Sequence, residues 1–167
     1  MTLVRNKLTT YLDERNIKYH LIHHSLDYNA KQTASDTTTP PGSFAKTVVL
    51  KVDEGHAIAV VTASERVDLV RFRDAIGASS VELVHEDELL DLFPDCEIGA
   101  EPPLGNLYGL PVYVSRALSN DDVITFNAGT HLEVIRMAYA DFAKHVQPQV
   151  LDIAIGNGTG VSCRPDG

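Results

Sequence analysis

The sequence predicts an α+β domain with a mixed or largely antiparallel β-sheet, and three observations support this. Segments with helical spacing of apolar residues are interspersed with short β-branched, apolar segments typical of strands. Several strand segments are separated by short turns, as in β-hairpins, which join antiparallel neighbours. The 167 residues are 44% apolar and 22% charged, which is ordinary for one globular domain.

Residues 3–15 are expected to form the first helix, because leucine, valine and tyrosine side chains at helical spacing give the segment one apolar face. Residues 17–22 follow as a short strand. The polar segment over residues 25–43 contains a helix candidate at residues 30–35. It ends in Pro40-Pro41-Gly42, which predicts a loop.

The strongest strand signals lie at residues 47–52 and 57–62, which are β-branched and apolar. A hairpin turn is expected between them at residues 53–56. Residues 67–76 then have helical spacing. Gly77 suits the end of that helix, because glycine readily adopts the left-handed conformation of a C-terminal cap.

Residues 81–84 predict a further strand, and residues 86–93 a helix whose first turn is acidic, as the helix dipole favours. Prolines and glycines indicate a loop over residues 94–111. The remaining expected elements are strands at residues 112–114, 123–126 and 132–137 and a last helix at residues 140–146.

We place a single domain at residues 1–146 and a glycine-rich C-terminal tail at residues 147–167, which we expect to be flexible. The glycines at residues 156–160 resemble a phosphate-binding loop only superficially. They open no predicted helix and lack the Lys-Ser/Thr pair of that motif.

The formal net charge of −9 excludes the broad positive field that drives non-specific nucleic-acid binding. Residues 1–51 nevertheless carry a net charge of +3, so a local nucleic-acid contact is expected there. Acidity that serves only solubility is the alternative. The sequence has no apolar run long enough for a membrane span, and two cysteines are too few for a disulfide framework. We expect no signal peptide, because the first residues include charged side chains and no long apolar run. We therefore expect a cytoplasmic protein with Cys96 and Cys163 reduced.

Three places could carry chemistry, and the first is Lys46 at the start of the strand over residues 47–52. Its ammonium group could hold a phosphate or a carbonyl oxygen at the rim of a pocket. The alternative is a strand-end lysine whose amine simply reaches solvent.

The second place is the loop Gly99-Ala100-Glu101-Pro102-Pro103. Two prolines stiffen it, and glycine allows close approach of the backbone. Its N–H groups could polarise a carbonyl that becomes tetrahedral, as an oxyanion hole does. A plain structural turn is the alternative.

The third place is Gly129-Thr130-His131, between two expected strands. His131 could bind a ligand or relay a proton, or it could be an exposed side chain of a hairpin turn. His20 and His24 would share one face of a strand, but no third ligand follows at a metal-binding spacing, so we expect no metal and no cofactor. Cys96 has no base nearby in sequence, which favours a packing role.

Four blocks of sequence, in this order and spacing, resemble the YbaK/ProX family, the free-standing relatives of the editing domain of bacterial prolyl-tRNA synthetases. The blocks are residues 45–50, 93–105, 108–112 and 128–131. The resemblance covers about residues 3–146. It implies a curved, mixed sheet, partly barrel-like and surrounded by helices.

The resemblance also implies hydrolysis of the ester between a wrong amino acid and its tRNA. Lys46 matches the lysine most closely tied to activity, and Gly99–Pro103 matches the loop whose backbone faces the aminoacyl carbonyl. Gly129 and His131 match a Gly-x-His turn, and His24 matches a histidine before the first family helix. The partners implied are the acceptor end of a mischarged tRNA and, as a further candidate, an aminoacyl-tRNA synthetase. Nothing indicates an oligomer, so we slightly favour a monomer.

The chain departs from the family at several positions, so the amino acid and tRNA are not fixed by the resemblance. Glu101 stands where a small apolar residue is usual, Leu104 where phenylalanine is frequent, and Ser115 where aspartate is common. Thr47 occupies a position that tunes substrate choice in relatives. A carboxylate at Glu101 would repel an anionic substrate or favour an α-ammonium group.

The mechanism we expect needs no nucleophilic side chain, because an aminoacyl ester is already activated. The loop N–H groups over Gly99–Pro103 would bind the carbonyl oxygen, and Lys46 would anchor the terminal nucleotide. A ribose hydroxyl of the substrate would orient the water, as the resemblance suggests. Two alternatives stay open: a binding module of the same fold without catalysis, and a hydrolase of another small ester.

Overall fold

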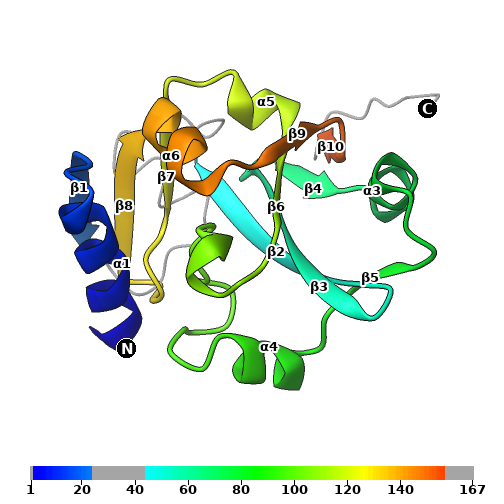
Figure 1. Ribbon diagram of the computed structural model, residues 1–167, viewed down its shortest axis with the longest axis horizontal. Helices are drawn as coiled ribbons and strands as arrows, with labels where there is room; N and C mark the ends of the chain where they lie inside the picture. Colours follow the sequence, from blue (N-terminus) through cyan, green and yellow to red (C-terminus); the bar gives the residue numbers. More distant parts are fainter. Residues whose placement is uncertain (1, 24–43, 157–167) are drawn as a thin grey trace.

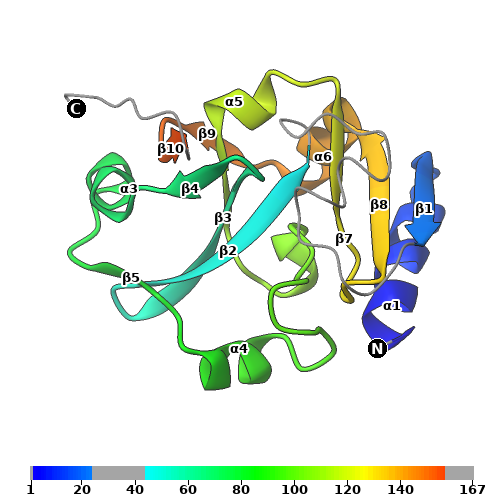
Figure 2. The ribbon, with the colours of Figure 1, turned by 180° about the vertical axis from the view of Figure 1, so that it is seen from behind.

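The computed structural model describes residues 2–23 and 44–156 (Figures 1 and 2). The helices are α1 (Thr2–Glu14), α3 (Leu69–Ile76), α4 (Glu86–Leu92), α5 (Arg116–Ser119) and α6 (Tyr139–Val146), with a 3-10 helix η2 (Gly105–Leu107). The strands are β1 (Tyr19–His23), β2 (Ala45–Val52), β3 (Gly55–Thr62), β4 (Glu65–Val67), β5 (Val81–Leu83), β6 (Val112–Ser115), β7 (Val123–Asn127), β8 (Glu133–Ala138), β9 (Gln149–Leu151) and β10 (Ala154–Gly156).

The described strands form three sheets, and the largest is mixed as predicted. Its order is β5-β2-β3-β6-β9. The strands β5, β2 and β3 pair antiparallel, whereas β3, β6 and β9 pair parallel. The second sheet, β1-β8-β7, is antiparallel throughout, and the third pairs β10 with β4. The predicted α+β class with a mixed sheet is confirmed.

The partly barrel-like sheet is not confirmed. The two larger sheets are joined in the described part of the chain by one isolated bridge, between Phe44 and Thr125. A barrel requires a continuous ladder of hydrogen bonds around the sheet. The short edge strands β5 and β9 leave the five-stranded sheet open, so the described strands close no barrel.

The five-stranded sheet separates two apolar cores. Successive side chains of a strand point to opposite faces. Val49 and Ile58, which are register partners, pack in the larger core with α1 and the three-stranded sheet. Leu50 and Ala59 face the other way and pack with Phe72 of α3. Figure 1 shows α1 and α3 at opposite ends of the molecule, consistent with these two cores.

Most of the predicted elements are confirmed within two residues at their ends. The helix predicted at residues 67–76 is α3, which begins after Asp68. The Asp68 carboxylate accepts a hydrogen bond from the backbone N–H of Arg71, and Gly77 ends the helix with a φ of 71°. The helix candidate at residues 30–35 and the Pro-Pro-Gly loop lie outside the described residues.

Five short elements were not predicted: β4, η2, α5, β9 and β10. None is longer than four residues, so their apolar pattern is too short to distinguish an element from a loop. The last two matter for the domain boundary that the sequence placed at residue 146. β9 pairs with β6 and β10 pairs with β4, and Ile153 between them is fully buried. Residues 149–156 are therefore part of the sheets rather than of a tail.

No helix in the described ranges has the length and apolar content needed to cross a membrane.

Gly105 provides a test of the packing below the loop that follows α4. A Cβ atom at this position would lie 2.5 Å from the carbonyl oxygen of Leu110 and 2.6 Å from Cγ2 of Val112. We expect Gly105→Ala to lower the free energy of unfolding by about 1–3 kcal/mol, since the backbone of Leu110 must shift. Urea denaturation measures this. Gly55→Ala is the control, because its Cβ would meet only the Val52 carbonyl oxygen at 3.8 Å. Equal losses in both variants would contradict the packing argument.

Candidate functional site

A pocket of about 600 Å³ lies along the edge of β2 that β5 leaves uncovered. β5 pairs only with Leu50–Val52, so the first half of β2 has no neighbour from β5. The elements around the opening, β2, β4, β5 and α4, can be followed in Figure 2. The lining residues are Lys46, Thr47, Val48, Val49, Arg66, Val67, Leu69, Leu83, Val84, Leu89, Ile98, Gly99 and Glu101.

Four of the predicted site residues line this pocket together: Lys46 and Thr47 from β2, and Gly99 and Glu101 from the loop after α4. The sequence separates these pairs by about fifty residues. The fold brings them together because the loop after α4 returns across the open edge of β2. Most of the other lining residues are valine, leucine or isoleucine, so the pocket has apolar walls with a few charged groups.

The other predicted site residues do not line the pocket. Ala100, Pro102 and Pro103 are buried behind its wall, and Gly129 and Thr130 are buried in the turn between β7 and β8. His131 lies in the same turn and is partly exposed. His24 lies outside the described residues. Direct contact of a substrate with any of these residues stays a prediction.

Lys46 is held in place by the segment that follows β3. Its Nζ donates a hydrogen bond of 2.7 Å to the carbonyl oxygen of Glu65. Partial burial lowers the pKa of Lys46, and the negative charge of Glu65 acts in the opposite direction. One N–H of an ammonium group is thus engaged, which leaves two donors for a ligand.

Glu65 organises this corner through its carboxylate. Oε1 accepts hydrogen bonds from the backbone N–H of Thr62 at 3.0 Å and from the hydroxyl of Ser115 at 2.9 Å. Ser115 also accepts the N–H of Leu118 and so caps α5. The serine that replaces a common family aspartate therefore has a structural partner. Sequence reasoning missed Glu65, because it carries no motif and acts on Lys46 through its backbone.

Arg66 was also missed, and it adds a second cationic residue to the pocket. It lies on β4, where its register partner is Ile155 of β10. The residue is exposed. A three-residue strand gives no periodic signal, so only the structure identifies Arg66 as a neighbour of Lys46.

Glu101 is the one acidic residue that lines the pocket. Only 5% of the residue is exposed, and its Oε2 accepts the backbone N–H of Gly99 at 3.3 Å. Burial raises the pKa of the Glu101 carboxyl, whereas the N–H groups of Glu101 and Gly99 and the charge of His131 lower it. Desolvation is the largest of these effects.

The loop over Gly99–Pro103 was expected to offer free N–H groups for an oxyanion hole, but the N–H groups of Gly99 and Ala100 already have acceptors. The N–H of Gly99 faces the Glu101 carboxylate, and the N–H of Ala100 donates to the carbonyl oxygen of Glu97 at 3.0 Å. Pro102 and Pro103 have no N–H. A carbonyl oxygen that binds the Gly99 N–H must therefore displace the Glu101 carboxylate.

The turn over Gly129–His131 holds the pocket loop by four hydrogen bonds. Glu97 N–H donates to the Gly129 carbonyl at 2.8 Å, and Gly129 N–H donates to the Ala100 carbonyl at 3.0 Å. His131 N–H donates to Glu97 Oε1 at 2.8 Å. The imidazole Nε2 lies 2.8 Å from the Ile98 carbonyl oxygen, which can only accept, so this nitrogen carries the hydrogen. The contacts of His131 are those of a positioning residue.

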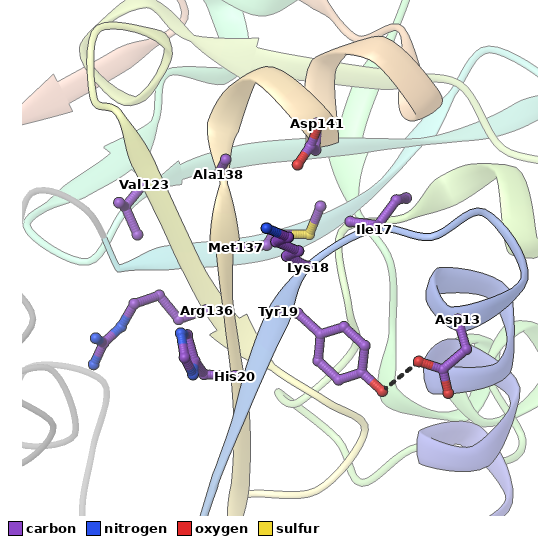
Figure 3. A pocket seen from close by; sticks show the side chains of 10 residues that line it. All are labelled: Asp13, Ile17, Lys18, Tyr19, His20, Val123, Arg136, Met137, Ala138 and Asp141. Atoms are coloured by element: carbon purple, nitrogen blue, oxygen red, sulfur yellow. Dashed lines mark hydrogen bonds between the residues drawn. The ribbon is translucent and has the colours of Figure 1, made fainter.

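A larger hollow of about 860 Å³ lies at the end of the three-stranded sheet (Figure 3). It shares no lining residue with the pocket at β2. Figure 3 shows Lys18, His20 and Arg136 among its side chains, and a hydrogen bond of 3.0 Å from the Tyr19 hydroxyl to Asp13. The basic groups are accompanied by Asp13 and Asp141, so its lining has mixed charge.

The described residues contain no group of three His, Cys, Asp or Glu side chains that could hold a metal ion. His20 lies on β1, and its proposed companion His24 is not among them.

Cys96 is 8% exposed, and its Sγ lies 3.7 Å from the Tyr108 hydroxyl. Burial raises the pKa of the Cys96 thiol to about 11. The thiol is therefore protonated near neutral pH, and its contacts are those of a packed side chain.

A thiol-labelling experiment tests this state of Cys96. In a Cys163→Ser variant, Cys96 is the one remaining cysteine. At about pH 8, a thiol with a pKa of about 11 has roughly two hundredfold less thiolate than an ordinary cysteine. We expect alkylation by iodoacetamide to be slower by at least that factor in the folded protein than in urea. Similar rates in both states would show an exposed, reactive thiolate.

The raised pKa of Glu101 predicts a pH-dependent cost to stability. A carboxyl whose pKa is higher in the folded state than in the unfolded state loses stabilisation as the pH rises through the folded-state pKa. Glu101→Gln has no such charge. We expect the variant to be more stable than the parent at about pH 8, and this advantage to disappear below the unfolded pKa of about 4.3. Urea denaturation at both pH values measures it, and a pH-independent difference would contradict it.

Comparison with known proteins identifies the family of the chain. A family model described as the aminoacyl-tRNA editing domain matches residues 24–145. The Multifunctional Ser/Thr-tRNA deacylase ProXp-y of Escherichia coli (strain K12) is 24% identical over 156 residues, which cover 90% of this chain and 93% of the relative. A proline--tRNA ligase of Bacillus cytotoxicus is 33% identical over 79 residues, 47% of this chain but only 14% of the ligase.

A solved structure described as a candidate trans-editing enzyme for prolyl tRNA synthetase superimposes with a TM-score of 0.80. It is 21% identical, and the match covers 92% of this chain and 98% of that one. At this identity the likeness shows the fold. The family model covers most of the chain, and the chain belongs to the aminoacyl-tRNA editing domain family.

Proposed function

We propose that the protein hydrolyses the aminoacyl ester of mischarged tRNA, as a deacylase that acts in trans. One observation carries this proposal: Lys46 and the Gly99–Glu101 loop line the same pocket. In the family that the chain belongs to, the matching lysine and loop are the parts tied to the substrate. The relative from Escherichia coli is named for this kind of activity.

Lys46 and Arg66 give the pocket two cationic groups, which suit the phosphate of the terminal nucleotide. Two of the three donors of the Lys46 ammonium group are not used by Glu65. Holding the nucleotide here would place the ester beside the loop. Positioning of this kind lowers the barrier of a reaction by several kcal/mol.

The nucleophile is water in this proposal. The thirteen lining residues include no serine, cysteine or histidine, and Thr47 is their one hydroxyl-bearing side chain. The buried Thr47 hydroxyl has no hydrogen-bond partner among the described residues, so the lining offers no activated side-chain nucleophile of the Ser–His type. A ribose hydroxyl of the substrate orients the water, as the family resemblance suggests.

The apolar walls would select the aminoacyl side chain by size. A single methylene changes binding by about 1–3 kcal/mol, and an editing site amplifies such small differences by hydrolysis. Small side chains such as those of alanine, serine, threonine and cysteine are therefore the first candidates. Ser and Thr also occur in the name of the relative from Escherichia coli.

The tRNA is expected to approach over the N-terminal third, which carries a net charge of +3 within a chain of net charge −9. Lys18 of this segment is exposed and lines the larger hollow, together with Arg136. We propose the cytoplasm as the compartment, since tRNA is charged there. An aminoacyl-tRNA synthetase is a further proposed partner, and a monomer is the proposed state.

One observation supports a second candidate function, a binding module without catalysis. The Glu101 carboxylate holds the Gly99 N–H that an ester carbonyl would need. If a substrate cannot displace this carboxylate, the pocket binds an aminoacyl nucleotide without turnover. The same assays separate the two functions.

The central test is deacylation of mischarged tRNAs by the parent protein and by Lys46→Ala. We expect kcat/KM of the variant to fall by about 30- to 100-fold, because a charge-assisted contact with the nucleotide is lost. The panel contains alanine, serine and cysteine on tRNA-Pro, together with serine and threonine on noncognate tRNAs.

Lys51→Ala is the matched control, since Lys51 lies on the same strand but does not line the pocket. Unchanged turnover in Lys46→Ala would contradict the proposed site. Absence of turnover on every substrate, with tRNA still bound, would support the binding module instead.

A further inference from the structure

We propose that Glu101 recognises the α-ammonium group of the aminoacyl substrate, so that the pocket selects esters of free α-amino acids over N-blocked ones. This inference rests on the proposed function, because it assigns a part of the substrate to a residue of that site. The location, burial and surroundings of Glu101 carry the argument.

The charges of the pocket lie on different elements. The cationic residues, Lys46 and Arg66, belong to β2 and β4, whereas Glu101 belongs to the loop after α4. The end of an aminoacyl-tRNA is charged in the same two-ended way, with a phosphate on the nucleotide and an ammonium group next to the ester. An ammonium group is repelled by Lys46 and Arg66 and attracted by Glu101. The charge pattern therefore orients the substrate in one direction.

The Glu101 carboxylate has unused capacity to accept hydrogen bonds. An ionised carboxylate offers about four acceptor positions. The described contacts of the Glu101 carboxylate are with the backbone N–H groups of Gly99 and of Glu101 itself. None of the ion pairs among the described residues includes Glu101. A carboxylate that is 5% exposed and has no cationic partner within bonding distance is costly to bury, and an ammonium ligand would offset that cost.

The position of Glu101 also fits the covalent structure of the substrate. The α-ammonium nitrogen is bound to the carbon that carries the ester carbonyl. An ammonium group on Glu101 therefore places the carbonyl next to Gly99, within the same loop. An ammonium group that binds the Glu101 carboxylate would draw it away from the Gly99 N–H. The Gly99 N–H would then be free to bind the ester carbonyl oxygen.

The experiment compares two forms of one mischarged tRNA, with the α-amino group free or acetylated. Assays at about pH 7 keep most of the free amino group protonated, whereas a lower pH would favour the protonated form of Glu101, whose pKa burial raises. We expect the parent protein to prefer the free form by about 10- to 100-fold in kcat/KM, the range of a hydrogen bond between charged groups. In Glu101→Gln the preference is expected to fall to threefold or less, chiefly by slower turnover of the free form.

Two variants serve as controls. Lys46→Ala is expected to slow both forms equally, because Lys46 binds the nucleotide in this proposal. Glu82→Gln removes an exposed carboxylate on β5 that does not line the pocket, and it should keep the full preference. A parent protein without preference would overturn the role of Glu101. Equal loss of both substrates in Glu101→Gln would also overturn it, since that result indicates a general base.

A binding measurement separates this inference from the proposed function. The probe is 3′-amino-3′-deoxyadenosine with serine joined to its 3′-amino group by a stable amide, again with the α-amino group free or acetylated. Calorimetry is expected to show tighter binding of the free form by the same factor in the parent and not in Glu101→Gln. This result without turnover of any tRNA would support Glu101 and overturn the deacylase. Turnover of a mischarged tRNA combined with equal binding of both probes would support the deacylase and overturn the role of Glu101.

Discussion

The hydrogen bonds between the loop at residues 97–101 and the turn at residues 129–131 are the constraint on which the candidate site depends. They join a loop beside the five-stranded sheet to the β7–β8 connection of the three-stranded sheet. In the described part of the chain, one bridge is the only other ladder contact between these sheets. The position of the pocket loop relative to Lys46 is therefore set by how the two sheets pack.

The loop at residues 97–101 and the turn at residues 129–131 have different roles in the site. Gly99 adopts a φ of +88°, and a Cβ there would lie 3.4 Å from Cε1 of His131. Glycine therefore serves both the left-handed conformation and the close approach of the imidazole. Gly99 and Glu101 face the pocket, whereas His131 and Glu97 hold the loop from behind. A histidine beside an active-site loop can matter without any contact with the reacting atoms.

The sequence predicted the long elements correctly because their apolar periodicity spans at least one full repeat, as in β2, β3 and α3. It failed for β4, η2, α5, β9 and β10, whose three or four residues give too little pattern to distinguish them from loops. It also identified Lys46, Gly99 and Glu101 as candidates. It did not find Glu65, because a backbone carbonyl that positions a lysine leaves no signature in side-chain chemistry. Arg66 was missed because its place depends on pairing with β10, which is distant in the chain.

Glu101 connects the stability of the fold with the selectivity of the pocket. Burial that makes ionisation of the Glu101 carboxyl unfavourable also removes the water that would weaken its attraction to a cation. An exposed carboxylate would be cheaper for folding but would distinguish charged from neutral ligands poorly. A smaller apolar residue would remove both the cost and the discrimination. Glu101, in place of the small apolar residue usual in the family, therefore makes the loop less stable and the pocket more selective.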